Sequence, residues 1–165
     1  MTIDNENVGH ATQPHANPPI PTGRYRLHPE LTTVAFSAKK LWVFTIRGTM
    51  QLESGTFTVA NPLERSTLHA VLAADTFTTP VRKRDEHVKS ATLLDVATYP
   101  RIEFDSTEVA VEPGGAFAVS GLLAVHGRVQ PCVLTVTTSL LESGLVGFRA
   151  TASVDRRAFG VTARP

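Results

Sequence analysis

The chain has 165 residues, of which 42% are hydrophobic and 19% charged, and its net charge is +1. These values are typical of one globular domain with its own core. The near-neutral charge argues against a dedicated nucleic-acid binder, which needs a basic face. Cys132 has no second cysteine to pair with, and its place at the start of an apolar strand favours a buried filler over a nucleophile.

The first 22 residues are polar and carry prolines at positions 14, 18, 19 and 21. They lack the basic start and the apolar run of a secretory signal, so we expect a disordered arm over residues 1–22 and a cytoplasmic protein. No stretch reaches the roughly 20 apolar residues of a membrane-spanning helix. The basic run at residues 82–84 is most often a solvated face, although it also suits peripheral contact with anionic head groups.

From Gly23 onward, alternating or β-branched segments are separated by turn residues about every ten positions. The expected strands are Gly23–Leu27, Val34–Phe36, Leu41–Ile46, Phe57–Val59, Leu68–Ala74, Ile102–Val111, Phe117–Val125, Cys132–Val136 and Val146–Val154. Gly48 and Gly55 mark places where the chain bends or approaches another backbone. The pattern predicts an antiparallel barrel or sandwich.

A charged, helix-competent segment near residues 84–97 interrupts the strands. Asp85 can cap the turn that follows it, because a short carboxylate accepts hydrogen bonds from free backbone N–H groups. Leu93 and Leu94 supply apolar anchors, and Pro100 forces the preceding residue out of helical geometry. We therefore expect a short helical lid or plug across the mouth of the sheet structure.

The sequence shows no constellation for catalysis. It has no nucleophile elbow, phosphate-binding loop or dinucleotide fingerprint, and its six histidines lack the spacing of zinc ligands. His87, near Arg84, is a candidate for ligand contact, while a turn held by local hydrogen bonds explains the same residues. Small inward residues such as Ala70, Gly121 and Ala150 leave space inside a barrel, although a tapering barrel also needs them. The sequence therefore predicts neither a metal, nor a cofactor, nor an enzyme.

Three ordered blocks of sequence resemble the YceI-like family. They are Arg84–Ser90 with Leu94–Val96 and Tyr99–Ser106, then Gly121–Pro131, and finally Val154–Val161. The resemblance covers about residues 23–161. It implies an all-β fold, an extended antiparallel lipocalin-like barrel with one short helical segment. It also implies a tunnel for a long apolar molecule, typically a polyisoprenoid or an isoprenoid quinone, and a homodimer.

The chain departs from the family pattern at several places. Leu31 and Lys40 stand where the family usually has histidines, and Ala158 replaces a common aspartate. The barrel domain, residues 23–165, ends where members run on through one more strand. We therefore expect a sheet edge that stays open unless the arm, a partner chain or another segment fills it.

The leading hypothesis is a non-enzymatic carrier of a long-chain isoprenoid-type lipid. Its tunnel wall is drawn from residues that share a parity within their strands, and its polar gate from the helical segment. The wall comprises Phe36, Trp42, Phe44, Ile46, Leu72, Phe77, Phe104, Leu123, Val125 and Phe148, and the gate comprises Arg84 and His87. Plain core packing is the alternative for each wall residue.

Two other functions are compatible with the sequence. A filled barrel can act as an interaction module that dimerises or adds a partner strand at the open edge. An enzyme acting on a lipid in the tunnel has the least support.

Overall fold

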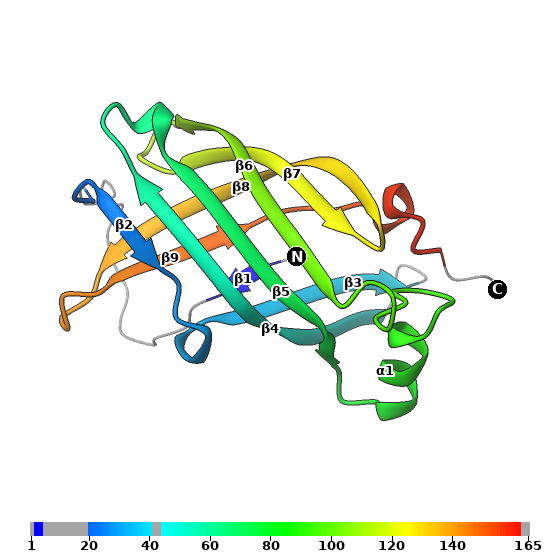
Figure 1. Cartoon of the computed structure of the whole chain (residues 1–165). Helices are drawn as coiled ribbons and strands as arrows, with labels where there is room; N and C mark the ends of the chain where they lie inside the picture. Colours follow the sequence, from blue (N-terminus) through cyan, green and yellow to red (C-terminus); the bar gives the residue numbers. More distant parts are fainter. Residues whose placement is uncertain (1, 5–19, 41–43, 163–165) are drawn as a thin grey trace.

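The computed structural model describes residues 2–4, 20–40 and 44–162. In this part of the chain nine strands form one antiparallel sheet in the order β2-β4-β3-β1-β9-β8-β7-β6-β5, and β4 also pairs with β5 (Figure 1). The strands are β1 Thr2–Asp4, β2 Gly23–Arg26, β3 Thr33–Lys40, β4 Phe44–Val59, β5 Thr67–Thr78, β6 Arg101–Val111, β7 Phe117–Val125, β8 Arg128–Leu140 and β9 Val146–Thr151. One α-helix, α1 (Arg82–Lys89), and three 3-10 turns, Pro29–Leu31, Leu63–Arg65 and Arg156–Phe159, complete the described elements.

The sheet closes on itself, which confirms the predicted antiparallel barrel. The pairing of β4 with β5 joins the last strand of the order to the second, so that eight strands form a ring and β2 extends from β4. Strand β1 lies between β3 and β9, with Ile3 opposite Val34 on one side and Ala150 on the other. Residues 2–4 of the expected disordered arm therefore belong to the sheet, and they occupy the edge that was expected to be open. Residues 5–19 of that arm lie outside the described part of the chain.

Inward and outward side chains alternate along the strands as the sequence pattern predicts. In β8, Cys132, Leu134 and Val136 are buried while the residues between them are exposed. In β7, Val119 is fully buried and Leu123 nearly so. Because successive side chains of a strand point to opposite faces, each strand contributes one row of apolar groups to the barrel interior.

Strand β4 runs unbroken where two shorter strands were expected. Of the two roles expected for its glycines, a bend or a close approach, the structure shows close approach at both. A Cβ atom on Gly48 would collide with the ring of Phe36 and with the carbonyl oxygen of Thr78, and one on Gly55 would lie 2.6 Å from Leu27 Cδ1. Each glycine thus makes room for a side chain that crosses over the strand.

The helix begins and ends earlier than predicted, at residues 82 and 89, and turns occupy most of residues 90–98. Asp85 does not cap the turn that follows it. Its Oδ1 accepts hydrogen bonds from Thr79 N at 3.0 Å and Thr79 Oγ1 at 2.7 Å, and its Oδ2 accepts one from Thr78 Oγ1 at 3.3 Å. The carboxylate therefore reaches backward and holds α1 against the end of β5.

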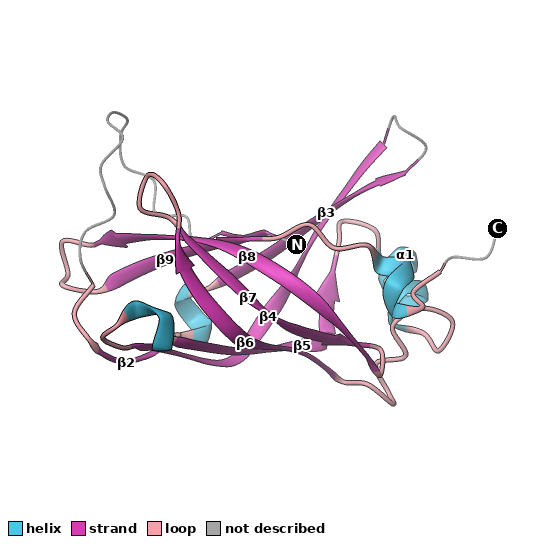
Figure 2. Cartoon of the chain, turned by 90° about the horizontal axis from the view of Figure 1, so that it is seen from above, coloured by secondary structure: helices cyan, strands magenta, loops and turns pink. Residues whose placement is uncertain are grey.

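The barrel is packed with side chains at its α1 end. Phe77 and Leu93 are buried there, and the ring of Phe36 stacks on that of Phe77 with centroids 4.6 Å apart. Phe159 and Val161, from the C-terminal 3-10 turn, belong to the same core. Helix α1 and strand β2 lie at opposite ends of the molecule in both views (Figures 1 and 2). The two ends therefore differ, and the end near β2 holds the cavity described below.

Substituting Gly121 by alanine is expected to destabilise the barrel by about 1–3 kcal/mol, the usual cost of overpacking. The added Cβ would clash with the Asp105 carbonyl oxygen, which cannot turn away, and would lie 2.5 Å from Phe104 Cζ. Urea unfolding measures the loss. Gly147→Ala is the matched control, because its nearest neighbour is the Ser139 hydroxyl, which can rotate. Equal stability of the two variants would contradict the close approach.

Asp85→Asn is expected to lower the melting temperature at neutral pH, and the difference from wild type should vanish in acid. Hydrogen bonds from Thr79 lower the pKa of Asp85 below its ordinary value. A lowered folded-state pKa stabilises the protein above the unfolded carboxyl pKa of about 3.9, and this contribution is lost as the pH falls through the folded-state value. Thermal unfolding from pH 7 to pH 3 tests this. Glu86→Gln, on the exposed face of α1, is the control, and a pH-independent deficit in Asp85→Asn would refute the role.

Candidate functional site

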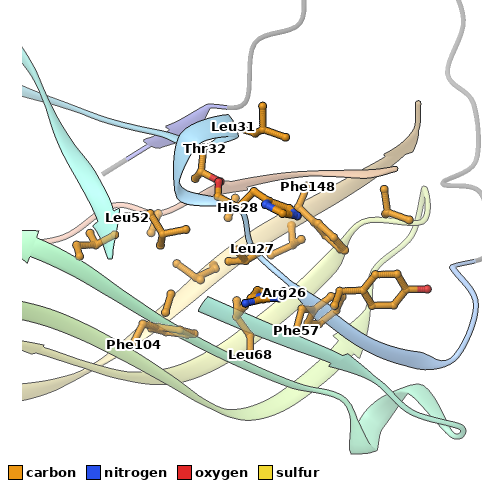
Figure 3. Close-up of a pocket in the computed structure, with 18 of the residues that line it drawn as sticks. Arg26, Leu27, His28, Leu31, Thr32, Leu52, Phe57, Leu68, Phe104 and Phe148 are labelled. Atoms are coloured by element: carbon orange, nitrogen blue, oxygen red, sulfur yellow. The ribbon is translucent and has the colours of Figure 1, made fainter. Parts of the chain in front are cut away.

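An apolar cavity of about 220 Å³ occupies the barrel at the end near β2 (Figure 3). Its wall is built from the inward rows of β4 to β9. The aliphatic and aromatic side chains of this wall are Leu52, Leu68, Leu72, Ile102, Phe104, Leu123, Leu134 and Val136. Such a lining offers dispersion contacts and exclusion of water, so the interior suits an apolar guest.

Small inward residues create the space, as the sequence analysis expected. Ala70 from β5 and Ala150 from β9 are buried and line the cavity, and Ala152 lines it beyond the end of β9. Gly121 acts indirectly, since its missing side chain lets the ring of Phe104 approach the backbone of β7 closely. Alanines at these inward positions therefore leave space that larger side chains would fill.

The cavity opens where two strands fail to meet. Strand β2 pairs with β4 alone among the described strands, and residues 146–149 of β9 pair with β8 alone. Residues from both sides line the cavity, including Leu27 next to β2 and Phe148 of β9. The rim carries two exposed leucines, Leu31 at 55% and Leu145 at 46% of full exposure. We refer to this opening between β2 and β9 as the mouth.

Three aromatic rings pack together behind the mouth. The ring of Phe148 lies edge-on to Phe57 with centroids 5.0 Å apart, and edge-on to Tyr25 with centroids 6.2 Å apart. The Tyr25 hydroxyl donates to the Pro21 carbonyl oxygen at 2.7 Å. That bond fixes the phenol at the rim, so an entering molecule meets ring faces and edges before it reaches the aliphatic wall.

The polar side chains of the lining gather at the mouth. They come from one short stretch, which supplies Arg26, His28 and Thr32 in addition to Tyr25. The Thr32 hydroxyl donates to the His28 carbonyl oxygen at 2.8 Å, so it is already engaged. No aspartate or glutamate is among the described residues that line the cavity. The mouth is thus the one part of the lining that carries a positive charge.

Four of the predicted wall residues, Leu72, Phe104, Leu123 and Phe148, line the cavity. The others do not meet it. Phe36 and Phe77 stack on one another toward the α1 end, and Phe36 also lines a shallow surface hollow beside Gly48. Val125 packs against the core, and Ile46 is half-buried in β4. Trp42 lies outside the described residues, as does the side chain of Phe44.

The predicted polar gate is not at this mouth. Arg84 and His87 belong to α1, at the opposite end of the barrel from β2 (Figures 1 and 2). His87 is exposed there. Sequence reasoning placed the lid over the mouth because the helical segment alone interrupts the strands. It missed the segment from Leu27 to Thr32, whose non-alternating residues give no periodic signal; an exposed leucine in a turn, Leu31, is the one hint.

Cys132 lines the cavity wall and is buried. Burial raises the pKa of its thiol, which keeps the sulfur protonated and unreactive at neutral pH. The predicted interpretation of this residue as a small apolar filler agrees with its surroundings.

Within residues 2–4, 20–40 and 44–162, no group of three or more His, Cys, Asp or Glu side chains could hold a metal ion. In the same ranges no helix has both the length and the apolar character needed to cross a bilayer.

Known structures share this fold. BcnA of Burkholderia cenocepacia superposes with a TM-score of 0.72 at 18% identity, over 80% of this chain and 82% of that one. The YCEI protein of Campylobacter jejuni gives a TM-score of 0.59 at 17% identity, over 76% and 77% of the two chains. At such low identity the likeness shows the fold alone.

Sequence comparisons are more specific. A UPF0312 protein of Pseudomonas savastanoi is 31% identical over 135 residues, which cover 78% of this chain and 70% of that protein. Protein YceI of Salmonella arizonae is 28% identical over 138 residues, with the same coverage. A family model described as the YceI-like domain matches residues 25–165. The chain therefore belongs to the YceI-like family.

Proposed function

We propose that this protein binds a long-chain isoprenoid-type lipid, a polyisoprenoid or an isoprenoid quinone, in the barrel cavity and carries it without chemical change. The observation that carries this proposal is the apolar cavity with its polar lining groups confined to the mouth. Family membership supports it, because the family resemblance implies a tunnel for such a molecule.

The size and lining of the cavity favour a thin apolar chain. Its volume of about 220 Å³ lies below the roughly 300–1,000 Å³ of pockets that enclose a drug-sized ligand. A slim chain can enter such a space end-on, with the remainder near the mouth. Each 100 Å² of apolar surface removed from water would contribute about 2.5 kcal/mol, so the interior can hold a chain by burial alone.

The chemistry of the lining supports binding rather than catalysis. Cys132 is kept protonated by burial, and the hydroxyls of Tyr25 and Thr32 donate to backbone carbonyl oxygens. No described carboxylate stands in the cavity to act as a general base or to orient a histidine. These groups can position a head group, and they do not form a nucleophile and base pair.

The alternative interaction module has less support. Its motivation was a sheet edge left open by a missing strand, and β1 pairs along that edge through Thr2 and Ile3. Its interior was expected to be filled, whereas the β2 half of this barrel is hollow. A homodimer remains a separate proposal, compatible with a carrier.

Native mass spectrometry of the purified protein, followed by identification of the released lipid, tests the carrier. We expect one isoprenoid-type molecule per chain, and the intact mass also reports whether two chains associate. A mass without lipid, together with no uptake of added geranylgeraniol, would overturn the proposal.

Ala70→Leu is expected to reduce binding of geranylgeraniol by about tenfold or more while slightly raising the stability of the lipid-free protein. The larger side chain would occupy part of the cavity from the wall, and filling an empty apolar space stabilises a core. Isothermal titration calorimetry and thermal unfolding measure the two effects. Ala124→Leu, at an outward position of β7 between the inward Leu123 and Val125, is the matched control. Unchanged binding in Ala70→Leu would place the ligand elsewhere.

A further inference from the structure

Exposed leucines are concentrated at the mouth. Four leucines are exposed in the described part of the chain, and three of them, Leu31, Leu140 and Leu145, belong to the two segments that flank the opening. Leu31 and Leu145 line the cavity, and Leu140 ends β8 just before Leu141, which also lines it. Leu140 is 67% exposed, more than any other large hydrophobic residue described. Aliphatic side chains exposed together at a rim mark an interaction surface.

Backbone hydrogen bonds hold both rim segments in place. In the hairpin between β8 and β9, Leu141 N donates to Leu145 O at 2.9 Å, and Gly144 N donates to Leu141 O at 2.9 Å. In the 3-10 turn Pro29–Leu31, Leu31 N donates to His28 O at 3.1 Å. The hairpin and β2 lie at the same end of the barrel (Figure 1), and Leu31 lies at the opening near His28 (Figure 3). The exposed leucines are therefore carried on ordered turns.

The charges around these leucines nearly cancel. Residues 23–32 and 140–149 together hold three arginines and two glutamates, namely Arg24, Arg26, Arg149, Glu30 and Glu142. The basic run at residues 82–84 lies on α1, at the opposite end of the barrel (Figures 1 and 2). A rim with exposed leucines and little net charge suits the apolar boundary of a bilayer, whereas a basic run suits anionic head groups.

The apolar surface of the rim continues into the cavity, because Leu31 and Leu145 are at once exposed and part of the lining. A protein seated on these leucines would cover the opening. A bilayer would instead bring its hydrocarbon up to the cavity wall, so that an apolar chain can pass between the two without crossing water. Since transfer of apolar surface into water is unfavourable, this continuity favours a bilayer as the occupant.

We propose that the mouth end of the barrel docks on a lipid bilayer, with Leu31, Leu140 and Leu145 inserted into its interfacial region. The inference extends the proposed function, on which the purpose of the contact rests, because it names the surface at which a lipid enters or leaves the cavity. The attachment is shallow and reversible, since it depends on a few side chains rather than on a spanning segment.

Flotation with vesicles of phosphatidylcholine that contain no isoprenoid tests the docking. We expect wild type to bind with similar strength at low and at high salt, because salt screens charges and leaves an apolar contact unchanged. Leu31→Ser and Leu140→Ser, one from each segment, should each weaken binding by about tenfold, the scale of one leucine side chain returned to water. Both side chains are exposed, so thermal unfolding should show both variants folded.

Val133→Ser is the matched control, because Val133 is 54% exposed on the outer face of β8 and does not line the cavity. It should bind vesicles as wild type does. Tryptophan substitutions at the same two positions add a readout of depth. In vesicles of brominated phosphatidylcholine, Leu140→Trp should be quenched more strongly than wild type, and Val133→Trp should not.

Several outcomes would overturn the docking surface. They are absence of vesicle binding by wild type, and equal weakening by Leu140→Ser and Val133→Ser. Binding to anionic vesicles alone, weakened by salt and by Lys83→Gln, would place the membrane contact at α1 instead. A dimer that ignores vesicles and dissociates in Leu140→Ser would show that a second copy covers the leucines.

The docking and the carrier function fail separately, because the vesicles contain no isoprenoid. Docking without uptake of geranylgeraniol would leave this inference standing and overturn the proposed function. Uptake of geranylgeraniol without docking would overturn this inference and leave the carrier standing.

Discussion

The closed ring of backbone pairing is the constraint on which the rest of this structure depends. Because β4 pairs with β5 and β1 lies between β3 and β9, the inward-facing side chains of the strands share one interior. A closed sheet leaves few unpaired N–H and C=O groups, and its interior must then be either filled by side chains or left as a cavity. The size of the inward-facing residues on each strand determines which parts of the interior are filled and which remain a cavity.

The two ends of the barrel differ in packing: the interior is filled with side chains toward α1 and contains the cavity toward β2. Toward α1, aromatic and branched side chains such as Phe77, Leu93 and Phe159 form a packed core. Toward β2, the inward rows include Ala70 and Ala150, and a cavity results. The packed half contributes most of the buried core, and the hollow half provides the space in which we propose that the lipid lies. Asp85 holds α1 against the end of β5 at the packed end.

The polarity of the cavity lining also changes along the barrel axis. The interior wall is apolar, and the charged and hydrogen-bonding side chains of the lining are supplied by the short segment that includes Arg26, His28 and Thr32. An amphipathic lipid has the same distribution, with a long apolar part and a compact polar end. The match between the two is the physical basis for proposing a carrier.

The sequence by itself determined the all-β class, the strand parities and the family. These depend on period-two alternation, turn residues and short motifs, which are all local features of the sequence. It also identified Leu72, Phe104, Leu123 and Phe148 as cavity-facing, and the small residues that make the space. It did not separate them from Phe36 and Phe77, which share the same parity but fill the other end of the barrel. Parity fixes the face of a strand that a residue occupies, and it carries no information about position along the barrel axis.

Only the tertiary structure decided where the barrel opens and what stands at the opening. The pairing of β1 with β3 and β9 joins segments that are about 30 and about 150 residues apart in the chain, so no local sequence pattern predicts it. The mouth arises because β2 and the start of β9 do not pair. Arg26 reaches it at the end of β2, and His28 in the non-alternating segment that follows. The local pattern likewise predicted that Asp85 caps the turn after it, whereas the position of α1 against β5 gives it Thr78 and Thr79 as donors. These features depend on contacts between distant segments, which a closed sheet creates only once it has formed.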